Sequence, residues 1–304
     1  MANDLLSGRR SWPAPAKINW FLSVTGRRAD GYHELQTAFQ FLSLHDSLTF
    51  VERGDGAIER LNDVPGILPR DDLVIRAAHA LKEAAHAPQG VGIRLTKRIP
   101  SGAGLGGGSS EAATTLVALN AIWGTGLSND ALAEIGLSLG ADVPIFVRGG
   151  SAWAEGVGEI LTPIRLPEAW MVVIYPACHV ATAEVFRAPQ LTRNSVPRTI
   201  PRFLRADASA IDPEQVLGIA ANDCEPVVRE LYPEVGNALD WLAQFASVRM
   251  TGTGSAVFGV FPSQSAAQAV ETGAPPEWQV FVTRAINTSP LQDLLNSAEG
   301  AELT

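Results

Sequence analysis

The residues best suited to chemistry lie in a glycine-rich segment, Pro100-Ser-Gly-Ala-Gly-Leu-Gly-Gly-Gly-Ser-Ser110. Glycines let backbone amides turn towards an anion. The helix expected to open at Ser109 points the positive end of its dipole into the same space. The hydroxyls of Ser109 and Ser110 can donate to phosphate or bind a phosphate-held magnesium ion. The segment therefore indicates a phosphate cradle.

Three other interpretations of this segment compete with the cradle. Gly102, Gly104 and Gly107 satisfy GxGxxG, which taken alone favours an NAD-dependent oxidoreductase. That fold requires a parallel strand after the first helix, whereas a second helix is expected here at 128–139. A Walker A loop requires Lys after its last glycine, and Gly108 is followed by Ser109. A flexible turn is disfavoured because five glycines stand between a strand and a Ser-Ser-capped helix.

The elements around this segment indicate an α+β fold. Strands are expected at 17–25, 35–44, 47–52, 91–96, 151–155, 170–175, 247–251, 256–261 and 278–284. Helices are expected at 73–87, capped by Asp71 and Asp72, and at 111–123, 128–139, 213–220, 223–231, 233–245 and 264–271. Because strands come in runs with helices grouped between them, two α+β lobes are favoured over a doubly wound sheet.

The lobes are predicted at residues 1–155 and 156–304. Three segments are expected to lie outside regular structure. Residues 1–12 are expected to be a loose leader, 189–205 a surface loop with solvated arginines, and the tail from Ser289 frayed.

Composition excludes several classes of protein. The 304 residues carry 23 Lys and Arg against 32 Asp and Glu, a net charge of −9, which argues against broad nucleic-acid binding. The two cysteines, Cys178 and Cys224, form no CxxC motif and exclude a disulfide scaffold or zinc ribbon. No signal peptide or membrane-length apolar run is found, so a cytoplasmic protein without a membrane partner is expected.

Two further segments carry a family pattern. The first, within residues 15–37, contains Ala16-Lys-Ile-Asn19 and Asp30-Gly-Tyr-His33, and the second is Gly140-Ala-Asp-Val-Pro-Ile-Phe146. Together with the glycine segment and Met250-Thr-Gly-Thr-Gly-Ser255, they closely resemble the GHMP kinase superfamily over about residues 13–286. The resemblance implies a kinase that uses ATP and Mg²⁺, with its active site in the cleft between two α+β lobes. ATP would then bind at Pro100, Ser101, Gly102, Ala103, Gly104, Leu105, Gly106, Gly107, Gly108, Ser109 and Ser110.

The Asp30-Gly-Tyr-His33 segment is similar to one branch of that superfamily. Members of this branch phosphorylate the 2-hydroxyl of a cytidyl diphosphate sugar alcohol in a non-mevalonate route to isoprenoid precursors. The resemblance implies that Asp142 is the general base and that Lys17 orients it and stabilises negative charge. Taken alone, Asp142 is more typical of a helix cap than of a general base, and Lys17 is more typical of a solvated strand start than of a catalytic residue.

The resemblance also implies a set of substrate contacts. Tyr32 and Phe186 would stack on the two faces of cytosine, with His33 at its edge. Asn19, on the same face of its strand as Lys17, would lie near the transferred group, and Thr182 would supply a cleft hydroxyl. The remaining histidines carry no motif and are expected to be structural or on the surface: His45, His79, His86 and His179.

Some departures and alternatives stay open at this stage. Ser101, Trp20 and Glu111 depart from the family pattern, and Glu111 leaves open how magnesium is held beyond the ATP phosphates and Ser109. A non-catalytic nucleotide sensor would not require both Lys17 and Asp142. A related kinase for homoserine, mevalonate or a sugar would not require the Asp-Gly-Tyr-His segment.

Overall fold

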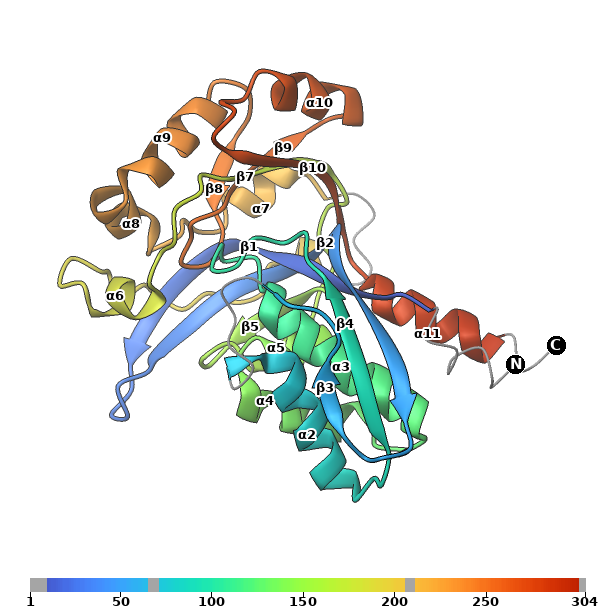
Figure 1. Ribbon diagram of the computed structural model, residues 1–304. Helices are drawn as coiled ribbons and strands as arrows, with labels where there is room; N and C mark the ends of the chain where they lie inside the picture. Colours follow the sequence, from blue (N-terminus) through green and yellow to red (C-terminus); the bar gives the residue numbers. More distant parts are fainter. Residues whose placement is uncertain (1–9, 65–70, 206–210, 301–304) are drawn as a thin grey trace.

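Two long antiparallel strands join the two lobes of the molecule (Figure 1). The computed structural model describes residues 10–64, 71–205 and 211–300. Strand β1 (Trp12–Arg27) pairs along its whole length with β2 (His33–Arg53). Strand β2 also pairs with β4 (Gly90–Thr96) and β5 (Ala152–Glu155) of the first lobe and with β10 (Gln279–Ile286) of the second. One strand therefore anchors the sheets of both halves.

The first lobe places helices against one face of its sheet. Its other strands are β3 (Ile58–Arg60), β4 (Gly90–Thr96), β5 (Ala152–Glu155) and β6 (Ile160–Pro163). Its helices are α2 (Leu73–Ala85), α3 (Gly107–Trp123), α4 (Asn129–Leu139) and α5 (Val143–Arg148). Helix α3 is buried along most of its length and packs against α2, α4, α5 and β1. Its fixed position holds the glycine segment that precedes it.

The second lobe is an antiparallel sheet covered by helices on its outer side (Figure 1). Its strands are β7 (Trp170–Tyr175), β8 (Val248–Met250), β9 (Val257–Phe261) and β10 (Gln279–Ile286). Helices α8 (Glu225–Leu231), α9 (Pro233–Leu242) and α10 (Gln264–Thr272) pack on them, and α6 (Thr182–Arg187), α7 (Pro213–Leu217) and a 3₁₀ turn, η2 (Arg202–Leu204), connect them. Between the lobes, Trp20 of β1 meets Phe258 of β9 edge-to-face.

The predicted α+β class is confirmed, whereas several element boundaries differ. Trp12 is 1% exposed and pairs with Leu48, so β1 begins inside the expected leader, of which residues 1–9 lie outside the described chain. The expected strands at 35–44 and 47–52 form the single strand β2, because buried Asp46 is bonded rather than placed in a turn. The expected frayed tail is helix α11 (Pro290–Gly300), which packs Leu291 into the core of the first lobe.

The predicted lobe boundary falls within a pair of adjacent strands. The boundary between residues 155 and 156 falls between β5 and β6, which pair with each other, and it stays a prediction.

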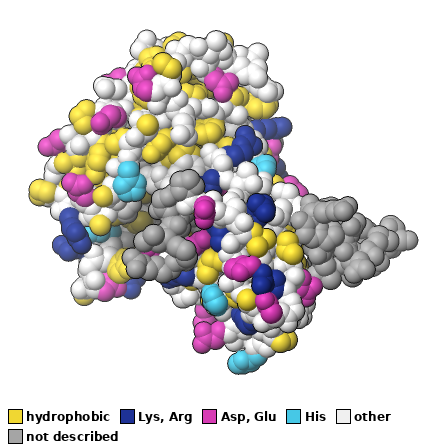
Figure 2. Space-filling view, in the orientation of Figure 1, with side chains coloured by type: hydrophobic (Ala, Val, Ile, Leu, Met, Phe, Trp, Pro, Cys, Tyr) yellow, Lys and Arg dark blue, Asp and Glu magenta, His cyan; other side chains and the backbone are white. Residues whose placement is uncertain are grey.

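Across the described ranges, no helix has the length and apolar character needed to span a bilayer. On the face shown in Figure 2, outside the grey atoms, Lys and Arg are interspersed with Asp and Glu.

A buried ion cluster fastens both ends of the glycine segment. Asp46 of β2 is fully buried and accepts hydrogen bonds from the backbone amides of Arg98 and Ile99, just before the segment. Lys97 lies 3.0 Å from Asp46 Oδ2 and also pairs with Glu111, in the first turns of α3. The ammonium group of Lys97 therefore helps to hold both ends of the segment, where the chain leaves β4 and where it enters α3.

The composition of this cluster raises the pKa of Glu111 to about 8. Burial is the main cause, and Asp46 adds to it, while Lys97 opposes it. One ammonium cannot balance two buried carboxylates, so the carboxyl without backbone donors holds the proton. The folded protein thus retains on Glu111 a proton that the unfolded chain releases near its ordinary pKa of 4.5.

Because Glu111 keeps its proton in the folded protein, we expect the free energy of unfolding to depend on pH. A raised folded-state pKa contributes stability that is complete below the unfolded value and is lost as pH rises through about 8. Glu111→Gln is neutral at every pH, so we expect it to flatten the decline in unfolding free energy between about pH 5 and about pH 8. Urea unfolding at several pH values measures the slope. Glu83→Gln, at an exposed site on α2, is the matched control, and an unchanged slope in the Glu111 variant would contradict the assignment.

Candidate active site

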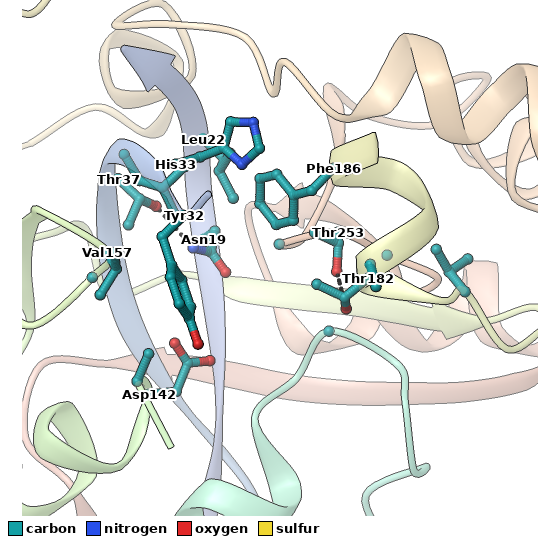
Figure 3. Close-up of a pocket in the computed structure, with 18 of the residues that line it drawn as sticks. Asn19, Leu22, Tyr32, His33, Thr37, Asp142, Val157, Thr182, Phe186 and Thr253 are labelled. Carbon is teal, nitrogen blue, oxygen red and sulfur yellow. Dashed lines mark hydrogen bonds between the residues drawn. The ribbon is translucent and has the colours of Figure 1, made fainter. Parts of the chain in front are cut away.

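A cavity of about 900 Å³ lies between the lobes and is lined by residues of both (Figure 3). Its walls come from β1, the turn between β1 and β2, the glycine segment and the start of α5 on one side. Residues 179–187 and the turn at 252–254 close the other side. The cavity is therefore bounded by every segment in which the sequence indicated chemistry.

Lys17 is held by several partners in this cavity. It is 3% exposed, and its ammonium donates to Asn19 Oδ1 at 2.7 Å and to the carbonyl oxygen of Gly104 at 3.1 Å. It also lies 3.5 Å from Asp142 Oδ2 and 5.3 Å from the ring centroid of Phe39. A buried ammonium requires such partners. The solvated-strand alternative for Lys17 is therefore wrong.

Asn19 is fixed by a residue of β2 and by the turn that follows β8. Its backbone amide donates to Thr251 Oγ1 at 2.9 Å, and its side-chain amide donates to Thr37 Oγ1 at 2.9 Å. The 250–252 turn is itself held by buried Asn222, whose Nδ2 donates to the carbonyls of Met250 and Gly252 at 2.8 Å each. The side-chain oxygen of Asn19 therefore stays aimed at Lys17.

Asp142 occupies the N-cap position of α5, but its side chain makes no capping hydrogen bond. The helix-cap alternative therefore fails. Its carboxylate instead faces Lys17 and is 34% exposed in the cavity. The buried side chains of Val143, Ile145 and Phe146 hold the short helix in the core. Asp142 is thus positioned by packing while its carboxylate stays open to a ligand.

In the glycine segment, buried side chains alternate with glycines that line the cavity. Ala103 and Leu105 are buried, and their carbonyl oxygens accept hydrogen bonds from the amides of Ala256 and Lys17, each at 2.9 Å. The glycines between and beside them have positive φ and line the cavity: Gly102, Gly104 and Gly106. Side chains at these positions would fill the space or clash. The backbone itself therefore forms this wall.

The start of α3 follows directly and offers anion-binding groups. Gly106 is the N-cap, without a side-chain cap bond, so the first amides of α3 have no intrahelical acceptor. Ser110 Oγ is buried without a hydrogen-bond partner among the described residues, whereas Ser109 is half-buried. Of the predicted ATP residues, only Gly102, Gly104 and Gly106 line the cavity, and the others do not: Pro100, Ser101, Ala103, Leu105, Gly107, Gly108, Ser109 and Ser110.

The donor set fits magnesium held chiefly by a nucleotide. Among the described residues, no group of three or more His, Cys, Asp or Glu side chains is arranged to hold a metal ion. Mg²⁺ in kinases usually takes one or two protein oxygens together with phosphate oxygens and water. Asp142 and the hydroxyl of Ser109 are oxygen donors at this end of the site, and Ser109 Oγ lies near Gly140.

Aromatic side chains form the other end of the cavity. His33, the first residue of β2, stacks on Phe186 of α6 with ring centroids 5.0 Å apart and planes at 22°. Tyr32 lies in the preceding turn, is 66% exposed, and points its hydroxyl towards the part of the cavity that holds Asp142 (Figure 3). Burial, followed by the charges of Arg193 and Arg27, lowers the pKa of His33.

The structure also adds residues that the sequence did not single out. Thr182 shares a hydrogen bond of 2.9 Å with Thr253, which belongs to the quoted 250–255 motif. His179 lines the cavity beside Gly102, although no motif marked it. Arg193 is half-buried and bonded to His33, so the expectation of solvated arginines in 189–205 is wrong for this residue.

Known protein families match both halves of this chain. Residues 72–150 match the GHMP kinases N terminal domain, and residues 206–276 match GHMP kinases C terminal. The chain is 52% identical over 284 residues to a 4-diphosphocytidyl-2-C-methyl-D-erythritol kinase of Nitrosococcus oceani, covering 93% of this chain and 97% of that protein.

Two solved structures are similar to this chain, one in sequence and fold and the other in fold alone. A crystal structure of 4-(cytidine 5'-diphospho)-2C-methyl-D-erythritol kinase is 35% identical, with a TM-score of 0.77 over 91% of this chain and 99% of that one. A crystal structure of mevalonate kinase, 15% identical with a TM-score of 0.65 over 91% of this chain and 99% of that one, shares the fold.

The family matches identify an ATP-dependent small-molecule kinase of the GHMP type, and in this chain a glycine wall and a helix N-terminus lie beside a lysine–carboxylate pair. The matches cover nearly the whole chain at high identity. Within the GHMP kinases, the chain belongs to the 4-diphosphocytidyl-2-C-methyl-D-erythritol kinase family.

The glycine wall predicts a position-specific effect of one methyl group. A Cβ on Gly106 (φ +72°) would lie 2.7 Å from Phe146 and 3.1 Å from Lys17 Cγ. We expect Gly106→Ala to lower kcat/KM for ATP by about 10²-fold, because the wall and Lys17 must shift. Gly126→Ala is the matched control, since Gly126 has nearly the same φ (+69°) but nothing within 4 Å of its Cβ. Equal activity of the two folded variants would contradict the cradle.

Proposed function

We propose that this enzyme transfers the γ-phosphoryl group of ATP to the 2-hydroxyl of 4-diphosphocytidyl-2-C-methyl-D-erythritol, a step of the non-mevalonate route to isoprenoid precursors. The observation that carries the proposal is the Lys17–Asp142 pair, 3.5 Å apart, beside the glycine wall of a cavity with an aromatic far end. Relatives with this activity in their names are about half identical to the chain.

In the proposed reaction, Asp142 accepts the proton of the 2-hydroxyl as its oxygen attacks phosphorus. A sugar hydroxyl is a poor nucleophile at neutral pH, so a positioned carboxylate assists it. Lys17 orients this carboxylate and balances the negative charge that builds up between the acceptor oxygen and the phosphoryl group. Asn19 keeps the ammonium in place through its 2.7 Å hydrogen bond and lies beside the acceptor.

The residues from Pro100 to Ser110 are proposed to hold ATP. The glycines admit the phosphates close to the backbone, and the free amides at the start of α3 donate to them. Magnesium, bound chiefly by the phosphates with Ser109 as an additional donor, neutralises their charge. The buried hydroxyl of Ser110, which has no hydrogen-bond partner among the described residues, would donate to a phosphate.

The aromatic end is proposed to bind the cytosine. Tyr32 and Phe186 would contribute stacking faces, and His33 would bind the edge of the base. Thr182, already paired with Thr253, would contact the connecting part of the substrate. This division places base recognition at one end of the cavity and phosphoryl transfer at the other.

We further propose that the enzyme works in the cytoplasm, with Mg²⁺, and without nucleic-acid or membrane partners. The free thiols of Cys178 and Cys224 suit a reducing compartment, and the net charge of −9 disfavours polyanions.

A substrate panel tests the proposed reaction directly. ADP release is measured with 4-diphosphocytidyl-2-C-methyl-D-erythritol, mevalonate and homoserine at matched concentrations. We expect turnover with the cytidyl substrate alone, because only it can occupy the aromatic end and the Lys17–Asp142 end together. Faster turnover of mevalonate or homoserine would refute the proposal and favour another kinase of the superfamily.

The catalytic pair predicts the effect of two substitutions. We expect Asp142→Asn and Lys17→Ala each to reduce kcat by roughly 10²–10⁴-fold, since one removes the base and the other its charge partner. Steady-state rates and circular dichroism are measured together. Asp130→Asn, at a largely exposed carboxylate on neighbouring α4, is the control expected to keep full activity. Rates near the wild type in both test variants would rule out these roles.

A further inference from the structure

Arg193 lies in an irregular segment, yet all three nitrogens of its guanidinium are bonded. Nη2 donates to the carbonyl oxygens of Phe186 at 2.9 Å and Ala188 at 2.7 Å, and Nη1 donates to that of Leu191 at 3.1 Å. Nε donates to His33 Nε2 at 3.2 Å. The carbonyls around the end of α6 thus fix the guanidinium, and the guanidinium in turn meets one defined atom of His33.

This contact determines where the imidazole of His33 carries its proton. An arginine nitrogen donates hydrogen bonds and never accepts them. Nε2 of His33 must therefore be the acceptor, so a neutral His33 carries its proton on Nδ1. Burial and the nearby charges of Arg193 and Arg27 also lower the pKa of His33, which favours the neutral ring.

The orientation of the His33 ring is fixed as well. Its plane lies nearly parallel to the Phe186 ring, at 22°, and its Nε2 edge is held by Arg193. His33 lines the cavity, and its Nδ1 has no hydrogen-bond partner among the described residues. A donor of known identity, Nδ1–H, is therefore left for a ligand.

We propose that Arg193 is a positioning residue that locks His33 in its Nδ1–H tautomer and thereby selects cytosine over uracil. N3 of cytosine is an acceptor, whereas N3 of uracil carries a proton. A fixed Nδ1–H donor pairs with the first and opposes the second, leaving two buried donors face to face. The opposite tautomer would present an acceptor at Nδ1 and would favour uracil.

This inference rests on the proposed function, because it assumes that a pyrimidine binds at the aromatic end. Its chemical basis, however, is separate from catalysis. The hydrogen bonds of Arg193 go to His33 and to carbonyls around the end of α6, and none goes to Lys17, Asp142 or the glycine segment. A loss of Arg193 should therefore change base preference while the chemical step is retained.

The test combines a spectroscopic measurement with a specificity measurement. In the ¹⁵N-histidine-labelled wild type, the His33 signals are assigned by their loss in His33→Gln, and their ¹⁵N shifts report the tautomer. We expect a protonated Nδ1 and an unprotonated Nε2. The ratio of kcat/KM for cytidyl and uridyl forms of the substrate is then compared between wild type and Arg193→Met. We expect the cytidyl preference to fall by about 10-fold or more, through KM and with kcat largely kept.

The matched control is Arg202→Met, the same substitution at an exposed arginine that begins the nearby η2 turn, for which no change is expected. An Nε2–H tautomer in the wild type would overturn the proposal even if the Arg193 variant failed to fold. An unchanged cytidyl preference in folded Arg193→Met would also overturn it, as would an equal rise of KM for both bases. If the wild type turns over neither nucleotide substrate, the proposed function fails, and the tautomer measurement still reports on Arg193.

Discussion

The site depends first on keeping one ammonium group out of water. Lys17 is almost fully buried, and it is held by the side chain of Asn19, a carbonyl of the glycine segment and the carboxylate of Asp142. These partners come from β1, from the loop before α3 and from the start of α5, which are far apart in the chain. Because a buried cation without partners is strongly disfavoured, its desolvation ties the three segments to one geometry. The same requirement that stabilises Lys17 therefore assembles the reacting end of the cavity.

The glycine segment can form one wall of the reacting end only because neighbouring buried groups hold it in place. Its glycines have no side chains to pack, so its position is set by the buried side chains of Ala103 and Leu105 and by the Asp46–Lys97–Glu111 cluster at its ends. Ordering a loop of this composition costs much conformational entropy, and these buried contacts offset that cost. Glu111, which departs from the family pattern, belongs to this cluster. Its side chain is buried against Lys97, which places it in the support of the loop rather than at the metal.

The sequence predicts the parts of this protein whose chemistry is local. The glycine segment, the alternation of Lys17 and Asn19 and the α+β order of elements follow from short-range patterns, and the fold and kinase class are confirmed. The roles of individual site residues stay predictions, although the structure brings Lys17 and Asp142 together. Helix α11 and the continuity of β2 could not be predicted, because Leu291 and Asp46 are buried by distant segments. No local pattern distinguishes Arg193 from the solvated arginines around it, since its partner His33 lies 160 residues away.

The two ends of the cavity are built by different physical means. The reacting end uses charge compensation between regular elements, which fixes groups that must stabilise developing charge. The aromatic end takes one wall from β2 and the other from α6 and an irregular segment, where ring stacking alone would leave the His33 edge free to rotate. Three carbonyl oxygens hold the guanidinium of Arg193, and its Nε–H in turn removes this freedom from His33. Recognition at this end thus depends on the direction of one N–H bond, which packing cannot specify but a fixed arginine can.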